Sequence, residues 1–104
     1  SSYKIMKKTR VKLDSENSLL IKSERGICIY EVVYDSCVLV ESEEVSQEYC
    51  VMVFYNGDNL LLQTVVSKET IEEKFYWILN KAPIEIYSEE LVYVNSSSPK
   101  VKLL

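Results

Sequence analysis

The chain has 104 residues, is 47% hydrophobic and carries a formal net charge of −4 at pH 7. This length favours a single domain, and a chain of this size buries enough apolar surface to need no disulfide or metal support. No run of 18 apolar residues occurs, and the basic N-terminal stretch lacks an apolar segment. Neither a membrane-spanning helix nor a secretion signal is therefore expected.

The first residues alternate between apolar and basic side chains. Tyr3, Ile5, Val11 and Leu13 share one face, and the basic stripe, defined as Lys4, Lys8, Arg10 and Lys12, occupies the other. A period of two predicts a strand over residues 3–13 with one buried face. The polar residues 14–17 predict a turn, and a second short strand follows at 18–23.

The middle of the chain predicts more strands. Residues 27–34 read as a central strand, and Asp35-Ser36 as a tight turn into a strand at 37–41. Residues 49–66 predict a hairpin around Asn56-Gly57, with a type I′ turn that would place Val53 opposite Leu60. Both faces of this hairpin are apolar, so each must be covered.

One amphipathic helix is predicted at about 67–82. Ser67 is the expected N-cap, Pro83 ends the helix, and a single apolar stripe contains Ile71, Phe75, Ile78, Leu79 and Ala82. Residues 84–87 and 91–94 then predict one or two closing strands, either a hairpin or one bent strand.

Together these elements predict an α+β fold. Its main part is an antiparallel sheet of six to eight strands, forming a roll or a partly open barrel with the helix on one face. The order of elements, with a helix before the closing strands, resembles that of an OB-fold. Residues 1–95 form the expected domain. Residues 96–104 are a tail that is mobile or docks on a neighbour through Val101, Leu103 and Leu104.

Few residues offer catalytic chemistry. The chain has no His, its two Gly are isolated in turns, and Cys28, Cys37 and Cys50 lack the spacing of a metal site. We therefore expect no enzymatic activity, no cofactor and no metal. Three unpaired thiols favour a reduced, cytoplasmic protein. Abundant Glu and Lys with frequent Tyr, Val and Ile form a bias seen in proteins from hot environments.

The basic stripe has three possible interpretations. Residues 1–13 hold five basic and no acidic side chains, although the whole chain is acidic. Lysines often protect an edge strand from pairing with other chains. The stripe could instead meet an acidic patch of a partner, such as Glu41, Glu43, Glu44 and Glu48 on another subunit. It could also follow single-stranded nucleic acid, because alternate residues of a strand project roughly every 6.6 Å.

Trp77 and Tyr76 lie away from the apolar stripe of the helix, Trp77 by about 140° at 100° per residue. The chain itself could cover the indole. The alternative is an interface anchor, because buried Trp and Tyr dominate many binding sites. We therefore expect a protein-binding module, most simply a homodimer, with Trp77, Tyr76, Met52 and Phe54 at the interface. The alternative is an OB-like, nucleic-acid-binding accessory protein that uses the basic stripe.

Overall fold

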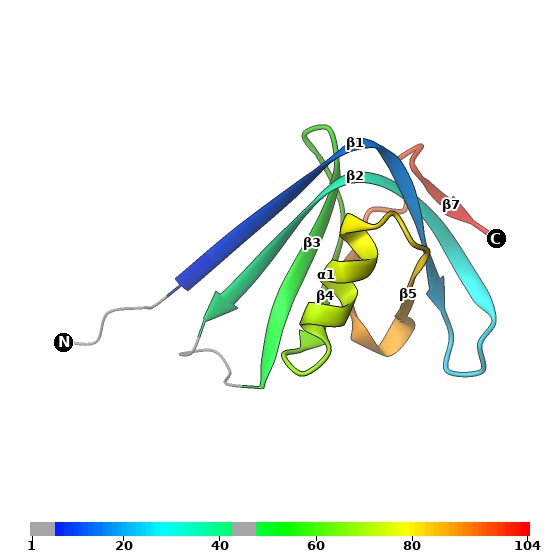
Figure 1. Ribbon diagram of the computed structural model, residues 1–104. Coiled ribbons are helices and arrows are strands. Elements are labelled where there is room, and N and C mark those ends of the chain that lie inside the picture. The colour runs from blue at the N-terminus through cyan, green and yellow to red at the C-terminus, as the bar shows by residue number, and fades with distance from the viewer. Residues whose placement is uncertain (1–5, 43–47) are drawn as a thin grey trace.

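The computed structural model describes residues 6–42 and 48–104. Over these residues the chain forms a seven-stranded sheet, one α-helix and one short 3-10 helix, which confirms the predicted α+β class. The elements in chain order are β1 (Met6–Lys22), β2 (Cys28–Ser42), β3 (Tyr49–Asn56), β4 (Asn59–Ser67), α1 (Ile71–Leu79), β5 (Ile84–Tyr87), η1 (Ser88–Glu90), β6 (Leu91–Val94) and β7 (Val101–Leu103) (Figure 1).

The sheet curls into a half-barrel around α1 (Figure 1). Its strands lie in the order β5-β1-β2-β3-β4-β6, and every pairing is antiparallel except that of β1 with β5. β5 and β6 are consecutive in the chain, yet they pair with β1 and β4 at opposite ends of this order. The closing strands are thus neither a hairpin nor one bent strand, because η1 carries the chain from one end of the sheet to the other.

β1 and β2 form one long, bent hairpin, which corrects the prediction of turns at 14–17 and 35–36. Lys12 pairs with Ser36 and Asn17 with Tyr34, so residues 13–16 lie opposite Asp35 alone. This extra length bends β1 without ending it. Ion pairs to distant segments hold the bulge, from Asp14 to Lys81 at 2.5 Å and from Glu16 to Lys100 at 2.9 Å.

The β3–β4 hairpin is present, but its register differs from the prediction. Asn56 pairs with Asn59, so Gly57 and Asp58 are the central residues of the turn. Only Gly57 has a positive φ, of 59°, as the first central residue of a type II′ turn requires. Asn56 stays in the strand because its amide donates to Glu16 and to the Val33 carbonyl. A bulge at Leu61 then places Val53 opposite Gln63.

The helix begins one turn later than predicted. Ser67 is the last residue of β4, paired with Tyr49, and its hydroxyl accepts a hydrogen bond from the Glu69 amide ahead of α1. At the other end, Ala82 N donates to Trp77 O and Lys81 N to Ile78 O, the pair of bonds that defines a Schellman motif. Lys81 takes the left-handed position, with φ at 56°.

The core lies on the inner, concave face of the sheet. Ile71 and Ile78 of α1 pack there with buried residues of the strands: Leu19, Ile21, Val32, Tyr34, Cys37, Leu39, Cys50, Met52, Phe54, Leu61, Leu62, Val66, Ile84, Ile86 and Val101. β7 pairs with residues 30–32 of β2 in the same chain, and Val101 is buried. The tail at residues 96–104, predicted to be mobile or to dock on a neighbour, therefore contributes a strand to the sheet of its own chain.

Candidate functional site

The two faces of β3 and β4 have different surroundings. Met52 and Phe54, expected at an interface, are at most 1% exposed and belong to the core. Side chains alternate along a strand, so their neighbours Val51 and Val53 project from the outer face. The two residues that the sequence predicted at an interface on β3 are therefore core residues, which fill the space under α1.

The outer face carries a group of valines that the sequence analysis did not single out. Val38 pairs with Val53, Val40 pairs with Val51, and Val51 also pairs with Val65, so all project from the same side. We call Val38, Val40, Val51, Val53 and Val65 the valine face. Val53 at its centre is 6% exposed and lies outside the core cluster of the inner face. No helix among residues 6–42 and 48–104 covers it, since α1 packs on the inner side.

The described part of the basic stripe forms one margin of the valine face. Lys8 pairs with Val40, Arg10 with Val38 and Lys12 with Ser36, so the three exposed cations share the outer side. β5 pairs with β1 only at residues 19–22, which leaves the stripe on an edge of the described sheet. Lys4 lies outside the described residues, as do Glu43 and Glu44 of the expected acidic patch.

Two tyrosines extend the valine face. Tyr55 pairs with Ser36 beside Lys12, and the guanidinium of Arg10 lies over its ring. Tyr93 of β6 pairs with Gln63 next to Val53 at the opposite margin. The outer face therefore has an apolar centre, an aromatic ring on each side and a basic edge.

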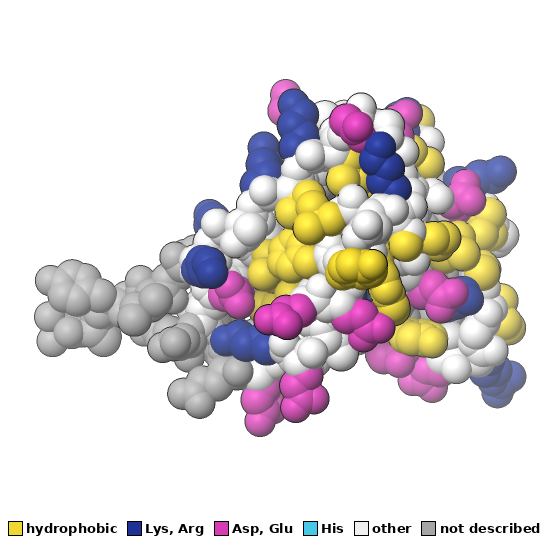
Figure 2. Space-filling view, in the orientation of Figure 1, with side chains coloured by type: hydrophobic (Ala, Val, Ile, Leu, Met, Phe, Trp, Pro, Cys, Tyr) yellow, Lys and Arg dark blue, Asp and Glu magenta, His cyan; other side chains and the backbone are white. Residues whose placement is uncertain are grey.

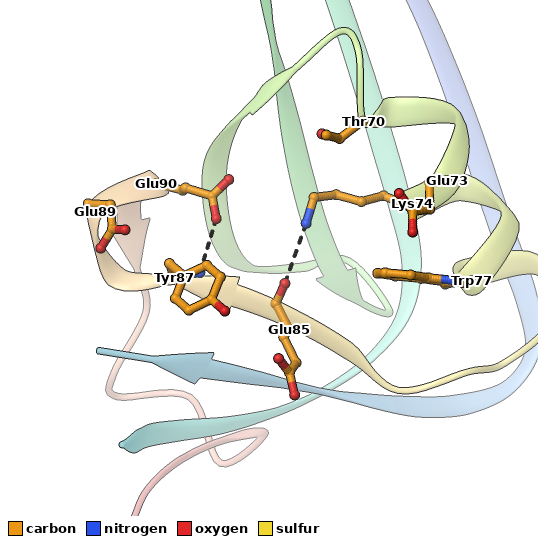
Figure 3. Close-up of a pocket in the computed structure, with 8 residues that line it drawn as sticks. All are labelled: Thr70, Glu73, Lys74, Trp77, Glu85, Tyr87, Glu89 and Glu90. Atoms are coloured by element: carbon orange, nitrogen blue, oxygen red, sulfur yellow. Dashed lines mark hydrogen bonds between the residues drawn. The ribbon is translucent and has the colours of Figure 1, made fainter. Parts of the chain in front are cut away.

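A separate cleft of about 440 Å³ lies between α1 and the β5–η1 segment. We call it the Trp77 cleft; it is lined by Thr70, Glu73, Lys74, Trp77, Glu85, Tyr87, Glu89 and Glu90. Figure 3 shows Trp77, Lys74 and Glu73 projecting from α1 on one side and the remaining acidic residues with Tyr87 on the other. Figure 2, viewed from the side of α1, shows exposed apolar side chains near the helix and acidic ones along its lower edge.

The charges of the Trp77 cleft are mostly negative. Glu85 forms an ion pair with Lys22 of β1 at 2.7 Å, and this hydrogen bond raises the pKa of Lys22. Glu90 accepts a hydrogen bond from the Tyr87 amide at 3.1 Å. Among the described residues of the lining, Lys74 alone is basic, and its Nζ lies 3.4 Å from the Glu85 carbonyl oxygen. Glu73 and Glu89 are both exposed at the rim.

The structure separates the two aromatic residues expected as anchors. Trp77 packs partly against the core and lines the cleft, so β5 and η1 flank the indole. Tyr76 is 64% exposed on another side of the helix. The sequence predicted that Trp77 lies off the apolar stripe, whereas in the structure the indole packs partly against the core. The segment that faces it across the cleft could not be predicted from helical periodicity.

Catalytic groups are sparse. The three cysteines are free, with Cys37 and Cys50 buried and Cys28 half-buried. Burial raises the pKa of Cys37 to about 12, which leaves almost no nucleophilic thiolate near neutral pH. Among the described residues, no group of three or more His, Cys, Asp or Glu side chains is placed to hold a metal ion. Likewise, no helix in the described ranges is long and apolar enough to span a membrane.

The chain matches no protein-family model, no curated protein and no solved structure.

Proposed function

We propose that this protein is a non-enzymatic protein-interaction module that forms a homodimer through its valine face. The observation that carries this proposal is an outer sheet face on which four partly exposed valines surround Val53 and which no helix of the described chain covers. A contiguous apolar patch of this kind is typical of interaction sites. Free thiols and the absence of His agree with a non-catalytic role in a reducing, intracellular compartment.

A second copy of the chain is the simplest partner for this surface. A two-fold contact needs one self-complementary patch, and two valine faces stacked on each other form a sheet-on-sheet interface about 10 Å thick. Lys8, Arg10 and Lys12 lie along one margin and stay at the rim of such a dimer. Charges at a rim keep their hydration, so the apolar centre can be buried without desolvating them.

The oligomeric state tests this proposal. Sedimentation equilibrium of the wild-type chain should give a dimer, and Val51→Lys should give a folded monomer because it places a charge between Val40 and Val65, within the contact. Val92→Lys is the matched control, since Val92 is 61% exposed on β6 and lies outside the valine face. This control should remain dimeric. A monomeric wild type, or a dimeric Val51→Lys variant, would contradict the proposal.

Nucleic-acid binding is the second candidate, and one observation favours it. Arg10 stacks on Tyr55, so the basic stripe has an aromatic neighbour on the same face that strand alternation within β1 did not reveal. Basic and aromatic side chains on one sheet face are typical of single-strand binding. The net charge of −4 opposes a polyanion. A salt-sensitive mobility shift with single-stranded RNA or DNA, lost in Arg10→Ala, would favour this candidate over the dimer.

A further inference from the structure

We propose that the Trp77 cleft binds an arginine side chain presented by a basic segment of a partner protein. The cleft lies between α1 and β5–η1, whereas the valine face is on the outer side of β2–β4, so the two sites share no residue. This inference therefore goes beyond the proposed dimer and does not depend on it. Its volume of about 440 Å³ is sufficient for one long side chain.

The helix presents an aromatic ring and a carboxylate together. Glu73 and Trp77 are four residues apart on α1, so they are neighbours on one helix face, and both line the cleft. A guanidinium is planar, stacks on an indole and donates two parallel hydrogen bonds to a carboxylate. Trp77 and Glu73 offer both contacts to a single arginine.

The opposite wall adds negative charge. Glu85 is neutralised by Lys22, and Figure 3 shows its side chain directed away from Lys74. The carboxylates of Glu89 and Glu90 also line this wall. One oxygen of Glu90 accepts a hydrogen bond from the Tyr87 amide. An arginine in the cleft thus meets carboxylates on both sides, and the Tyr87 ring, 41% exposed, forms a further apolar wall.

Lys74 is the feature that an incoming cation must displace. Its Nζ makes a long contact of 3.4 Å to the Glu85 carbonyl oxygen, so little stabilisation from this hydrogen bond is lost when the side chain moves. Lys74 is basic, unlike every other lining residue that the structure describes, so its removal should strengthen the binding of a cation. Carboxylates alone would attract any cation, whereas the indole beside Glu73 favours a planar guanidinium.

Fluorescence provides a direct measurement, because Trp77 is the only Trp in the chain. A peptide of alternating Gly and Arg, titrated into the full chain, should change the Trp77 emission saturably and bind more tightly than the Gly-Lys peptide of equal length. Glu73→Gln should weaken binding about two- to fivefold, as expected for the loss of one exposed ion pair. Lys74→Met should strengthen it.

Glu72→Gln is the matched control. Glu72 and Glu73 both lie in the first turn of α1, but only Glu73 lines the cleft, so the two variants share their effect on the helix and on net charge. Glu72→Gln should bind like the wild type. Equal weakening in both variants would overturn the proposal in favour of a general electrostatic attraction.

Anisotropy of a labelled Gly-Arg peptide extends the test to Trp77→Leu, which should bind about fivefold more weakly from loss of the cation–π contact. Equal binding of the Arg and Lys peptides, or no change in Trp77 emission, would also overturn it. Glu73→Gln should leave the oligomeric state unchanged, so a failure of this proposal is distinguishable from a failure of the dimer.

Discussion

The guanidinium carbon of Arg10 on β1 lies 5.5 Å from the centroid of the Tyr55 ring on β3. The contact spans β2 and joins the basic stripe on β1 to the Tyr55 ring at the side of the valine face. Arg10→Ala should therefore lower the free energy of unfolding by about 0.5–1 kcal/mol, the value of an exposed cation–π contact. Urea denaturation measures this loss.

Lys8→Ala is the control for Arg10→Ala. Lys8 is also exposed on the outer side of β1, opposite Val40, and contacts no aromatic ring within residues 6–42 and 48–104. Its substitution should change stability by less than about 0.5 kcal/mol. Similar losses in both variants would mean that the Arg10–Tyr55 contact does not stabilise the fold.

Glu16 should make stability depend on pH in the acidic range. Hydrogen bonds from Lys100 and then from Asn56 hold the pKa of this carboxyl below its ordinary value of 4.5. A folded pKa below the unfolded one contributes stability that is present above pH 4.5 and is lost as the pH falls through the folded pKa. Asp14 acts in the same direction, because the hydrogen bond from Lys81 lowers its pKa.

Equilibrium unfolding at a series of acidic pH values checks this prediction. Glu16→Gln should lose stability less steeply below pH 4.5 than the wild type. Lys100→Met removes the main partner of Glu16 and should also flatten the profile. An unchanged slope in both variants would show that the Glu16 network does not couple folding to protons.

The inner and outer faces of β3 should differ sharply in their response to truncation. Phe54 is fully buried and meets Tyr34 edge-to-face, with 5.0 Å between ring centroids. Phe54→Ala should reduce the free energy of unfolding by about 3–5 kcal/mol. Val51→Ala, measured under conditions that keep the chain monomeric, should cost less than about 1 kcal/mol, because Val51 remains partly solvated. Comparable losses would refute the assignment of the two faces.

The sequence predicted the elements of β3 and β4 but not their orientation. When both faces of a hairpin are apolar, alternation alone cannot say which face is inside. The available signal was side-chain size: the inner set includes Met52, Phe54 and Leu62, and the outer set is mainly valine. The single helix can cover one face, and larger side chains fill the space beneath it.

The bend of the β1–β2 hairpin could not be predicted from the local sequence, for a different reason. Residues 14–17 have the composition of a turn, and a turn is what local hydrogen bonding predicts. In the structure, their side chains bond to segments far along the chain, including Lys81 and Lys100. Tertiary partners thus convert an apparent turn into a bulge. The Trp77 cleft could not be predicted for the same reason, because the wall opposite α1 comes from β5 and η1, whose position depends on the tertiary fold.

Lys81 should be a site where glycine is more stable than alanine. It has a φ of 56° at the end of α1, a conformation that glycine adopts without strain and other residues adopt at a cost. Lys81→Gly should relieve this cost, and Lys81→Ala should keep it, although both variants lose the ion pair with Asp14. The glycine variant should therefore be more stable than the alanine variant by about 1 kcal/mol in thermal or urea unfolding. Equal stability of the two would contradict the backbone argument.

The thiols should react with a thiol reagent in an order set by burial. Cys37 is fully buried, and burial raises its pKa to about 12, so it should react only when the chain unfolds. Burial, and secondarily the charge of Glu41, also raises the pKa of Cys50, which should react slowly. Cys28 is half-buried and should react first.

Single Cys→Ser variants assign each phase of that reaction. At pH 8, Cys28→Ser should remove the fast phase, and Cys37→Ser should remove the slowest. Denaturant should then bring all remaining thiols to one common rate, because unfolding abolishes the differences in burial. A fast phase that survives in Cys28→Ser would mean that β2 or β3 opens to solvent more readily than its position in the core allows.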